Sequence, residues 1–204
     1  MILTLPNILT FARIVAIPIF VGAYFLSSDG SNNVVVIVFV LAAVTDWLDG
    51  FLARILKKTS TFGAFLDPVA DKLMVCTALV LLVSDHQLAD ELMFNVVFVV
   101  SILIIVGREV SVVALREWMA ELGNRASVAT SYLSKGKTMM QMIAIVLLLY
   151  GQPVGEFQTL IAGELLLYVA ATLTIWTMTI YLRAAVPTLM STDRDTGSES
   201  DLPD

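Results

Sequence analysis

The sequence reads Asp46-Trp47-Leu48-Asp49-Gly50-Phe51-Leu52-Ala53-Arg54 and then Gly63-Ala64-Phe65-Leu66-Asp67-Pro68-Val69-Ala70-Asp71-Lys72, with apolar runs on both sides. One face of a first helix would carry residues at i, i+3, i+4 and i+7, namely Asp46, Asp49, Gly50 and Ala53. The same face of a second helix would carry residues at i, i+4 and i+8, namely Gly63, Asp67 and Asp71. Two facing helices therefore direct four carboxylates at one volume. Ionisable groups among apolar helices are costly and mark function by default.

The composition outside these stretches is that of a membrane protein. Hydrophobic residues make up 58% of the 204 residues and charged residues only 15%, against about 25% charged in an average globular domain. The mean hydropathy is +0.87, which excludes a disordered chain and leaves too little polar surface for a soluble domain. The apolar segments are residues 10–27, 33–55, 66–84, 92–115, 138–151 and 158–182. They predict an all-α integral membrane bundle of six transmembrane helices.

The charges are distributed unevenly along the chain. The loops expected on one side of the membrane carry acids but no lysine or arginine, whereas the bases gather on the other side. The positive-inside rule then predicts that both termini are cytoplasmic. The net charge of −6 includes five acids and one base in residues 193–204. We expect a membrane domain over residues 1–185 and an acidic, disordered tail over residues 186–204. An acidic chain is not expected to bind nucleic acid.

Four carboxylates in one volume would repel one another unless cations offset them. Oxygen-only ligands suit magnesium or manganese. Gly50 and Gly63 leave room beside the carboxylates for a bulky ligand, and Arg54 can grip a phosphate with its planar guanidinium. Single residues have simpler explanations, since Asp67 before Pro68 can be a helix cap. Asp46 can form a buried ion pair with Arg54 or Lys72. Neither explanation accounts for all four aspartates together.

The pattern D-x2-D-G-x2-A-R-x8-G-x3-D-x3-D over residues 46–71 resembles the signature of the CDP-alcohol phosphatidyltransferase family. The resemblance implies a homodimeric bundle of six membrane helices with a polar cavity open to the cytoplasm. It also implies two divalent cations, Mg²⁺ or Mn²⁺, and transfer of a phosphatidyl group from CDP-diacylglycerol to an alcohol. The implied location is the bacterial cytoplasmic (inner) membrane, with the site on the cytoplasmic side of the bilayer.

The resemblance also implies roles for individual residues. Asp46, Asp49 and Asp67 would be metal ligands, and Asp71 would be both a ligand and the general base. The residues implied to contact CDP-diacylglycerol are Gly50, Ala53, Arg54, Ser60 and Gly63, with Asn7 and Thr10 as further candidates. The choice of Ser60 stays open against its neighbours Thr59 and Thr61. Asn7 and Thr10 can equally be a helix cap and an interfacial anchor.

The segments outside the signature resemble family members whose acceptor is sn-glycerol 3-phosphate. These segments are residues 5–13, 107–109, 114–123 and 134–138. An anionic acceptor needs bases beyond the metals, and Arg108, Lys135 and Lys137 are the candidates for binding its phosphate. Lys135 and Lys137 can also reflect membrane topology alone, and Arg108 can simply pair with Glu109.

Two rival functions remain open. A sister enzyme of the family would use another alcohol, such as serine, inositol phosphate or phosphatidylglycerol. A cation transporter would also place aspartates within membrane helices, although transporters usually show internal repeats, and this sequence has no evident repeat.

Overall fold

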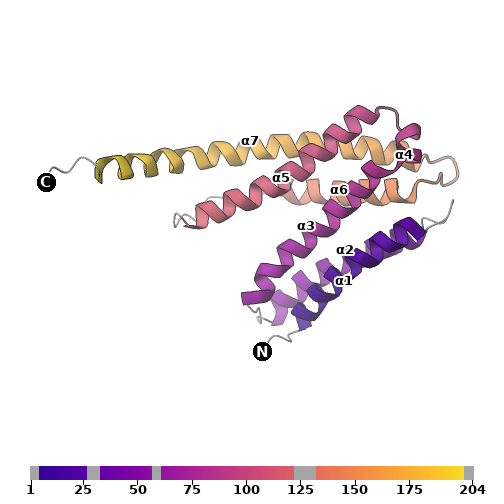
Figure 1. The fold of residues 1–204 in the computed structure, drawn as a ribbon, viewed down its shortest axis with the longest axis horizontal. Helices are drawn as coiled ribbons and strands as arrows, with labels where there is room; N and C mark the ends of the chain where they lie inside the picture. The colour runs from indigo at the N-terminus through magenta and orange to yellow at the C-terminus, as the bar shows by residue number, and fades with distance from the viewer. Residues whose placement is uncertain (1–4, 27–32, 57–60, 122–131, 200–204) are drawn as a thin grey trace.

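The computed structural model describes residues 5–26, 33–56, 61–121 and 132–199, and its regular elements over these ranges are all helices (Figure 1). They are α1 (Leu5–Leu26), α2 (Asn33–Leu56), α3 (Thr61–Ser84), α4 (His86–Glu91), α5 (Asn95–Glu121), α6 (Tyr132–Tyr150) and α7 (Thr159–Glu199). The predicted all-α class is confirmed. Each of the six predicted apolar segments corresponds to one long helix.

The long helices form two groups that α3 connects. Helix α1 packs against α2 and α3, and α7 packs along α5 and α6. Figure 1 shows α1 and α2 side by side, with α3 crossing from them toward the group of α5, α6 and α7. Contacts of α3 with α5 and α6, and of α2 with α6, join the two groups. Helix α3 therefore has neighbours from both groups.

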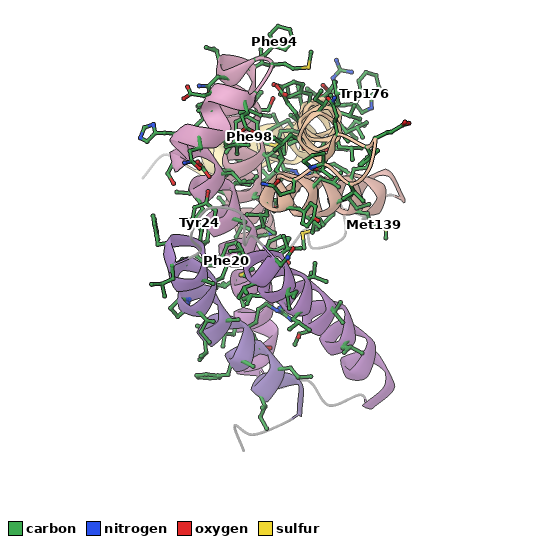
Figure 2. All side chains as sticks on the ribbon, turned by 90° about the vertical axis from the view of Figure 1, so that its right-hand side faces the viewer. Phe20, Tyr24, Phe94, Phe98, Met139 and Trp176 are labelled. Atoms are coloured by element: carbon green, nitrogen blue, oxygen red, sulfur yellow. The ribbon has the colours of Figure 1, made fainter. Side chains whose placement is uncertain are left out.

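The core draws apolar side chains from all six long helices. Phe20 of α1 packs on Phe39 of α2 with 5.8 Å between ring centroids, and both are fully buried. Leu79, Ile105 and Ile145 continue this core through α3, α5 and α6. Figure 2 shows Phe20 and Phe98 inside the molecule.

Large apolar side chains also cover much of the outer surface. Phe94, Met139 and Trp176 are exposed and lie toward the periphery in Figure 2. Three helices are apolar enough to cross a bilayer within the described residues, over Ile8–Leu26, Asn95–Leu115 and Thr159–Ile180. Shorter apolar stretches run over Asn33–Thr45 and Gly136–Tyr150. The protein is thus a membrane protein, while the count of six spans stays a prediction.

Two features differ from the sequence-based expectation. Helix α4 occupies a segment that the sequence predicts to be a loop. Asp85 stabilises this helix as its N-cap: Oδ1 of Asp85 accepts hydrogen bonds from the backbone N–H groups of Gln87 at 3.0 Å and Leu88 at 3.1 Å. Helix α7 continues to Glu199, well past the expected start of an irregular tail at residue 186. Adding a residue to an existing helix requires no new nucleation, which favours such an extension.

Candidate functional site

The candidate residues belong to five helices. Helix α1 carries Asn7 and Thr10, α2 carries Asp46, Asp49, Gly50, Ala53 and Arg54, α3 carries Gly63, Asp67 and Asp71, α5 carries Arg108, and α6 carries Lys135 and Lys137. Ser60 lies outside the described residues. Side chains are described for Thr10, Asp71, Arg108 and Lys137, and those of the other candidates lie outside the described part of the structure.

Asp71 borders a small cavity between the two groups of helices. The cavity is also lined by Arg13 of α1, by Ala42 and Ala43 of α2, and by Met142 of α6. Asp71 itself is partly exposed. The carboxylate that the sequence suggests as a base therefore faces a volume shared with α1, α2 and α6.

Helix α1 contributes buried polar side chains near this cavity. Thr10 and Arg13 fall at i and i+3 on one face, and each is only 2% exposed. A guanidinium is costly to desolvate, so its burial calls for a specific role. The inward orientation of Thr10 favours a role within the protein over that of an interfacial anchor.

Three cationic side chains surround Glu109, and the four residues come from three helices. We call them the Glu109 cluster: Lys72, Arg108, Glu109 and Lys137. Nζ of Lys72 on α3 donates to Oε2 of Glu109 at 2.8 Å. Oε1 of Glu109 accepts from Nη1 of Arg108 at 2.6 Å and from Nζ of Lys137 on α6 at 3.4 Å. The alternative that Arg108 pairs with Glu109 is thus confirmed as a contact, although the pair belongs to a larger group.

The Glu109 cluster is buried and carries excess positive charge. The side chain of Lys137 is 1% exposed and that of Arg108 is 10% exposed, whereas Lys72 reaches 31%. Lys72, Arg108 and Lys137 all donate to the single carboxylate of Glu109, so three cations gather around one acid. Clustered, poorly solvated cations attract anions strongly. This arrangement can hold a phosphate group.

Sequence reasoning left three polar residues of this region without a role. Lys72 appeared only as a possible ion-pair partner of Asp46, and Glu109 only as a possible partner of Arg108. Gln141 follows Lys137 by one turn and is 4% exposed. A signal was available for Glu109 and Gln141, because each is a polar residue within an apolar run.

Most of the predicted metal ligands lie outside the described side chains. Among the described side chains there is no group of three or more histidine, cysteine, aspartate or glutamate residues that could hold a metal ion. Of the four aspartates, only Asp71 is described at the side-chain level. Its oxygens are hard donors and fit magnesium or manganese, and α2, which carries Asp46 and Asp49, borders the same cavity through Ala42 and Ala43.

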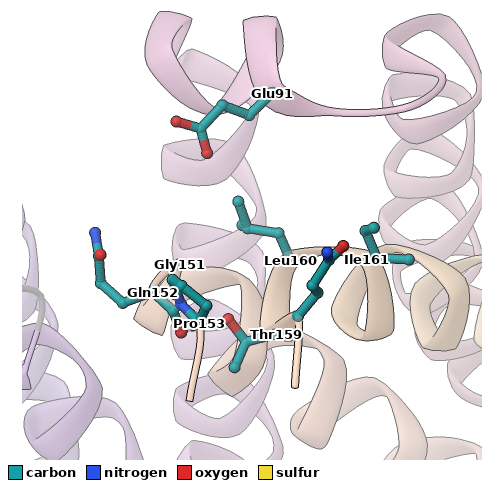
Figure 3. Close-up of a pocket in the computed structure, with 8 residues that line it drawn as sticks. Glu91, Gly151, Gln152, Pro153, Thr159, Leu160 and Ile161 are labelled. Carbon is teal, nitrogen blue, oxygen red and sulfur yellow. Dashed lines mark hydrogen bonds between the residues drawn. The ribbon is translucent and has the colours of Figure 1, made fainter. Parts of the chain in front are cut away.

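A groove without basic residues lies at the end of the molecule where the α6–α7 turn is found. This groove of about 470 Å³ lies between α4 and the turn joining α6 to α7, lined by Glu91, Gln152, Thr159 and neighbouring residues (Figure 3). Its lining holds an acid and amides and contains no lysine or arginine. The cationic side chains of the Glu109 cluster lie elsewhere, near the middle of α3 and α5 and in the first turns of α6.

Comparison with known proteins agrees with the sequence pattern. The model of the CDP-alcohol phosphatidyltransferase family matches residues 3–176. A Haemophilus influenzae protein named CDP-diacylglycerol–glycerol-3-phosphate 3-phosphatidyltransferase is 46% identical over 186 residues, which are 91% of this chain and 95% of the relative. Proteins of the same name from Pseudomonas fluorescens and Yersinia pestis are 46% and 48% identical, over 94% and 90% of this chain and 95% of each relative. The chain therefore belongs to the CDP-alcohol phosphatidyltransferase family.

Proposed function

We propose that this protein transfers the phosphatidyl group of CDP-diacylglycerol to sn-glycerol 3-phosphate, giving phosphatidylglycerophosphate and CMP. The observation that carries the choice of acceptor is the Glu109 cluster, because its three cationic side chains suit a phosphate-bearing alcohol. The name shared by relatives 46–48% identical to this chain supports the same acceptor. Serine, the acceptor of a sister enzyme, would not need this many bases.

Members of the family use divalent cations, and we assign two Mg²⁺ or Mn²⁺ ions to Asp46, Asp49, Asp67 and Asp71. The helical register supports this assignment, because Asp46 follows Ala42 and Ala43 of the Asp71 cavity by one turn of α2. When bound, the cations neutralise the pyrophosphate of CDP-diacylglycerol and stabilise the charge that develops on CMP as it leaves.

Asp71 is the general base in this proposal. Its carboxylate accepts the proton of the acceptor hydroxyl, whose oxygen then attacks the phosphorus that bears diacylglycerol. The bond from that phosphorus to the oxygen of CMP breaks, and its electron pair leaves with CMP. Asp71 is partly exposed, which supports this role because the acceptor must be able to approach the carboxylate.

The nucleotide half of the donor is assigned to α1, α2 and the start of α3. Arg54 grips a phosphate of the CDP group, and Gly50, Ala53 and Gly63 leave room for it. Ser60, Asn7 and Thr10 complete the assignment, and the burial of Thr10 supports an inward-facing role. Arg108, Lys135 and Lys137 bind the phosphate of the acceptor.

The reaction calls for a site at the membrane surface, because CMP is soluble in water and the acyl chains are not. We therefore place the protein in the bacterial cytoplasmic membrane as a homodimer, with its site and both termini on the cytoplasmic side. The bases gathered around the α2–α3 and α5–α6 connections, and the base-free loops on the other side, support this orientation.

An acceptor competition assay tests the proposal. Purified protein in detergent with Mg²⁺ is given labelled CDP-diacylglycerol together with glycerol 3-phosphate, serine, inositol phosphate and phosphatidylglycerol in equal amounts. We expect labelled phosphatidylglycerophosphate as the main product, with one CMP released per product. If another alcohol outcompetes glycerol 3-phosphate, the protein is a sister enzyme. If no CMP is released while liposomes containing the protein take up cations, the transporter reading replaces the enzyme.

A further inference from the structure

We propose that Glu109 is a positioning residue for the acceptor phosphate, which it serves through the cations around it. The inference rests on the proposed function, since that phosphate is the ligand concerned. Both carboxylate oxygens of Glu109 are engaged, Oε2 with Lys72 of α3 at 2.8 Å and Oε1 with Arg108 and Lys137 at 2.6 and 3.4 Å. One side chain of α5 thereby joins α3 and α6.

Burial explains why the cations need this carboxylate. The side chain of Lys137 is 1% exposed and comes from an apolar helix. A buried ammonium without a nearby anion either loses its proton or withdraws from the site, because burying an uncompensated charge is very unfavourable. Glu109 offsets the charge of Lys137 and orients both Lys137 and Arg108 before the substrate arrives.

The cations of the Glu109 cluster explain why this arrangement still accepts a phosphate. Three cationic groups donate to this one carboxylate, and a phosphate monoester brings a charge of about −1.5 to −2 at neutral pH. A phosphate beside these cations is therefore held by charge-assisted hydrogen bonds. Lys137 is the longest contact of Glu109 at 3.4 Å, and its ammonium has three donors, so it can turn one toward the phosphate while keeping Glu109.

Glu109 itself does not contact the phosphate in this proposal, because two anions repel each other. Arg108 and Lys137, which Glu109 contacts, are the bases assigned to the acceptor phosphate. The loss of Glu109 therefore weakens the binding of the acceptor in particular, and the binding of CDP-diacylglycerol much less.

Steady-state kinetics of CMP release tests this role with Glu109→Gln and Glu109→Asp, varying each substrate while the other is saturating. We expect Glu109→Gln to raise KM for glycerol 3-phosphate at least about tenfold, since the phosphate loses hydrogen bonds from charged groups. KM for CDP-diacylglycerol stays within about twofold, which identifies the acceptor as the substrate affected. Glu109→Asp keeps the charge and is expected to have a smaller effect.

Two further variants separate positioning from general stability. Glu164 is another buried glutamate, on α7, and it accepts from the backbone N–H groups of Met93 and Phe94 at 3.1 Å. Glu164→Gln is expected to lower thermal stability while KM for glycerol 3-phosphate stays unchanged. In a Lys137→Met background, Glu109→Gln should raise this KM much less than it does alone, because interacting residues are not additive.

The outcomes separate the two proposals. A wild-type protein that does not use glycerol 3-phosphate refutes the proposed function. A wild-type protein that uses it, together with a Glu109→Gln variant whose KM for it is unchanged, refutes the role of Glu109 alone, as does full additivity with Lys137→Met. If Glu109→Gln yields no folded protein, Glu109→Asp decides: a raised acceptor KM supports the role, and an unchanged KM overturns it.

Discussion

Asp71 and Lys72 are neighbours in the sequence, yet their side chains contact different parts of the protein. Asp71 borders the cavity shared by α1, α2 and α6, whereas Lys72 donates to Glu109 of α5. Successive helical residues differ in direction by about 100°, which allows one short stretch of α3 to contribute to both. The proposed base and the cations of the proposed acceptor site are thereby held by a single helix.

Removal of the proposed base gives a direct prediction. Asp71→Asn keeps the size of the side chain but cannot accept the proton, so CMP release should fall by a factor of about 10²–10⁴. The measurement is CMP release at saturating substrates and metal. Asp90→Asn, an exposed position on α4, should retain the wild-type rate. Wild-type turnover by Asp71→Asn would contradict the assignment of the base.

The residues of the site could be predicted from the sequence only where their spacing is local. The four aspartates follow helical intervals, and the family pattern fixes their positions. The Glu109 cluster could not be predicted in this way, because Lys72 and Lys137 are 37 and 28 positions from Glu109. Only the adjacent pair of Arg108 and Glu109 was visible, and the rest depends on how α3, α5 and α6 pack.

At the scale of elements, hydropathy located the long helices well, because each one contains a long apolar run. It missed α4, whose six residues depend on the cap at Asp85 rather than on periodicity. It also missed the extension of α7 past residue 186, where composition indicated solvated chain but helix continues. Caps and helix propagation are local backbone effects that hydropathy does not measure.

The contact between α6 and α7 gives a prediction about stability. A Cβ at Gly163 would lie 2.9 Å from Cγ of Leu148 and 3.2 Å from the backbone oxygen of Ala144. Gly163→Ala must therefore push the two helices apart, with an expected loss of about 1–3 kcal/mol in the free energy of unfolding. Thermal unfolding in detergent measures it.

Gly22→Ala is the matched control for Gly163→Ala. It lies within α1, and a Cβ there would meet nothing within 4 Å. Alanine also favours a helix more than glycine does, so the control should be at least as stable as the wild type. Equal stability of both variants would show that the two helices are not packed as closely as described.

At the scale of the whole molecule, the net charge of −6 is compatible with anionic substrates only if cations offset the aspartates. We predict that excess chelator abolishes CMP release, because the pyrophosphate of the donor is then not neutralised. Mg²⁺ or Mn²⁺ should restore the rate. Circular dichroism serves as the control and should show unchanged helix content. Undiminished CMP release in excess chelator would refute the proposed metal dependence.

The orientation in the membrane can be tested by labelling cysteines. In a Cys76→Ser background, Gln87→Cys on exposed α4 should react with an impermeant maleimide applied from outside the cytoplasmic membrane. Lys58→Cys, in the connection between α2 and α3, should react only after that membrane is permeabilised. The reverse labelling pattern would show that the bundle is inverted.

Because both proposed sites use residues of α3, insertions and deletions in this helix should be disfavoured during evolution. Inserting or deleting one residue between Asp67 and Lys72 would rotate the two ends of that stretch by about 100° relative to each other. Residues of α3 assigned to the proposed donor and acceptor sites would then point elsewhere, even though the mean hydropathy of the helix would hardly change. The turn between Gly151 and Thr159, which joins α6 to α7 at the far end, has no such angular constraint. Length variation should therefore accumulate in that turn and be absent from the first half of α3.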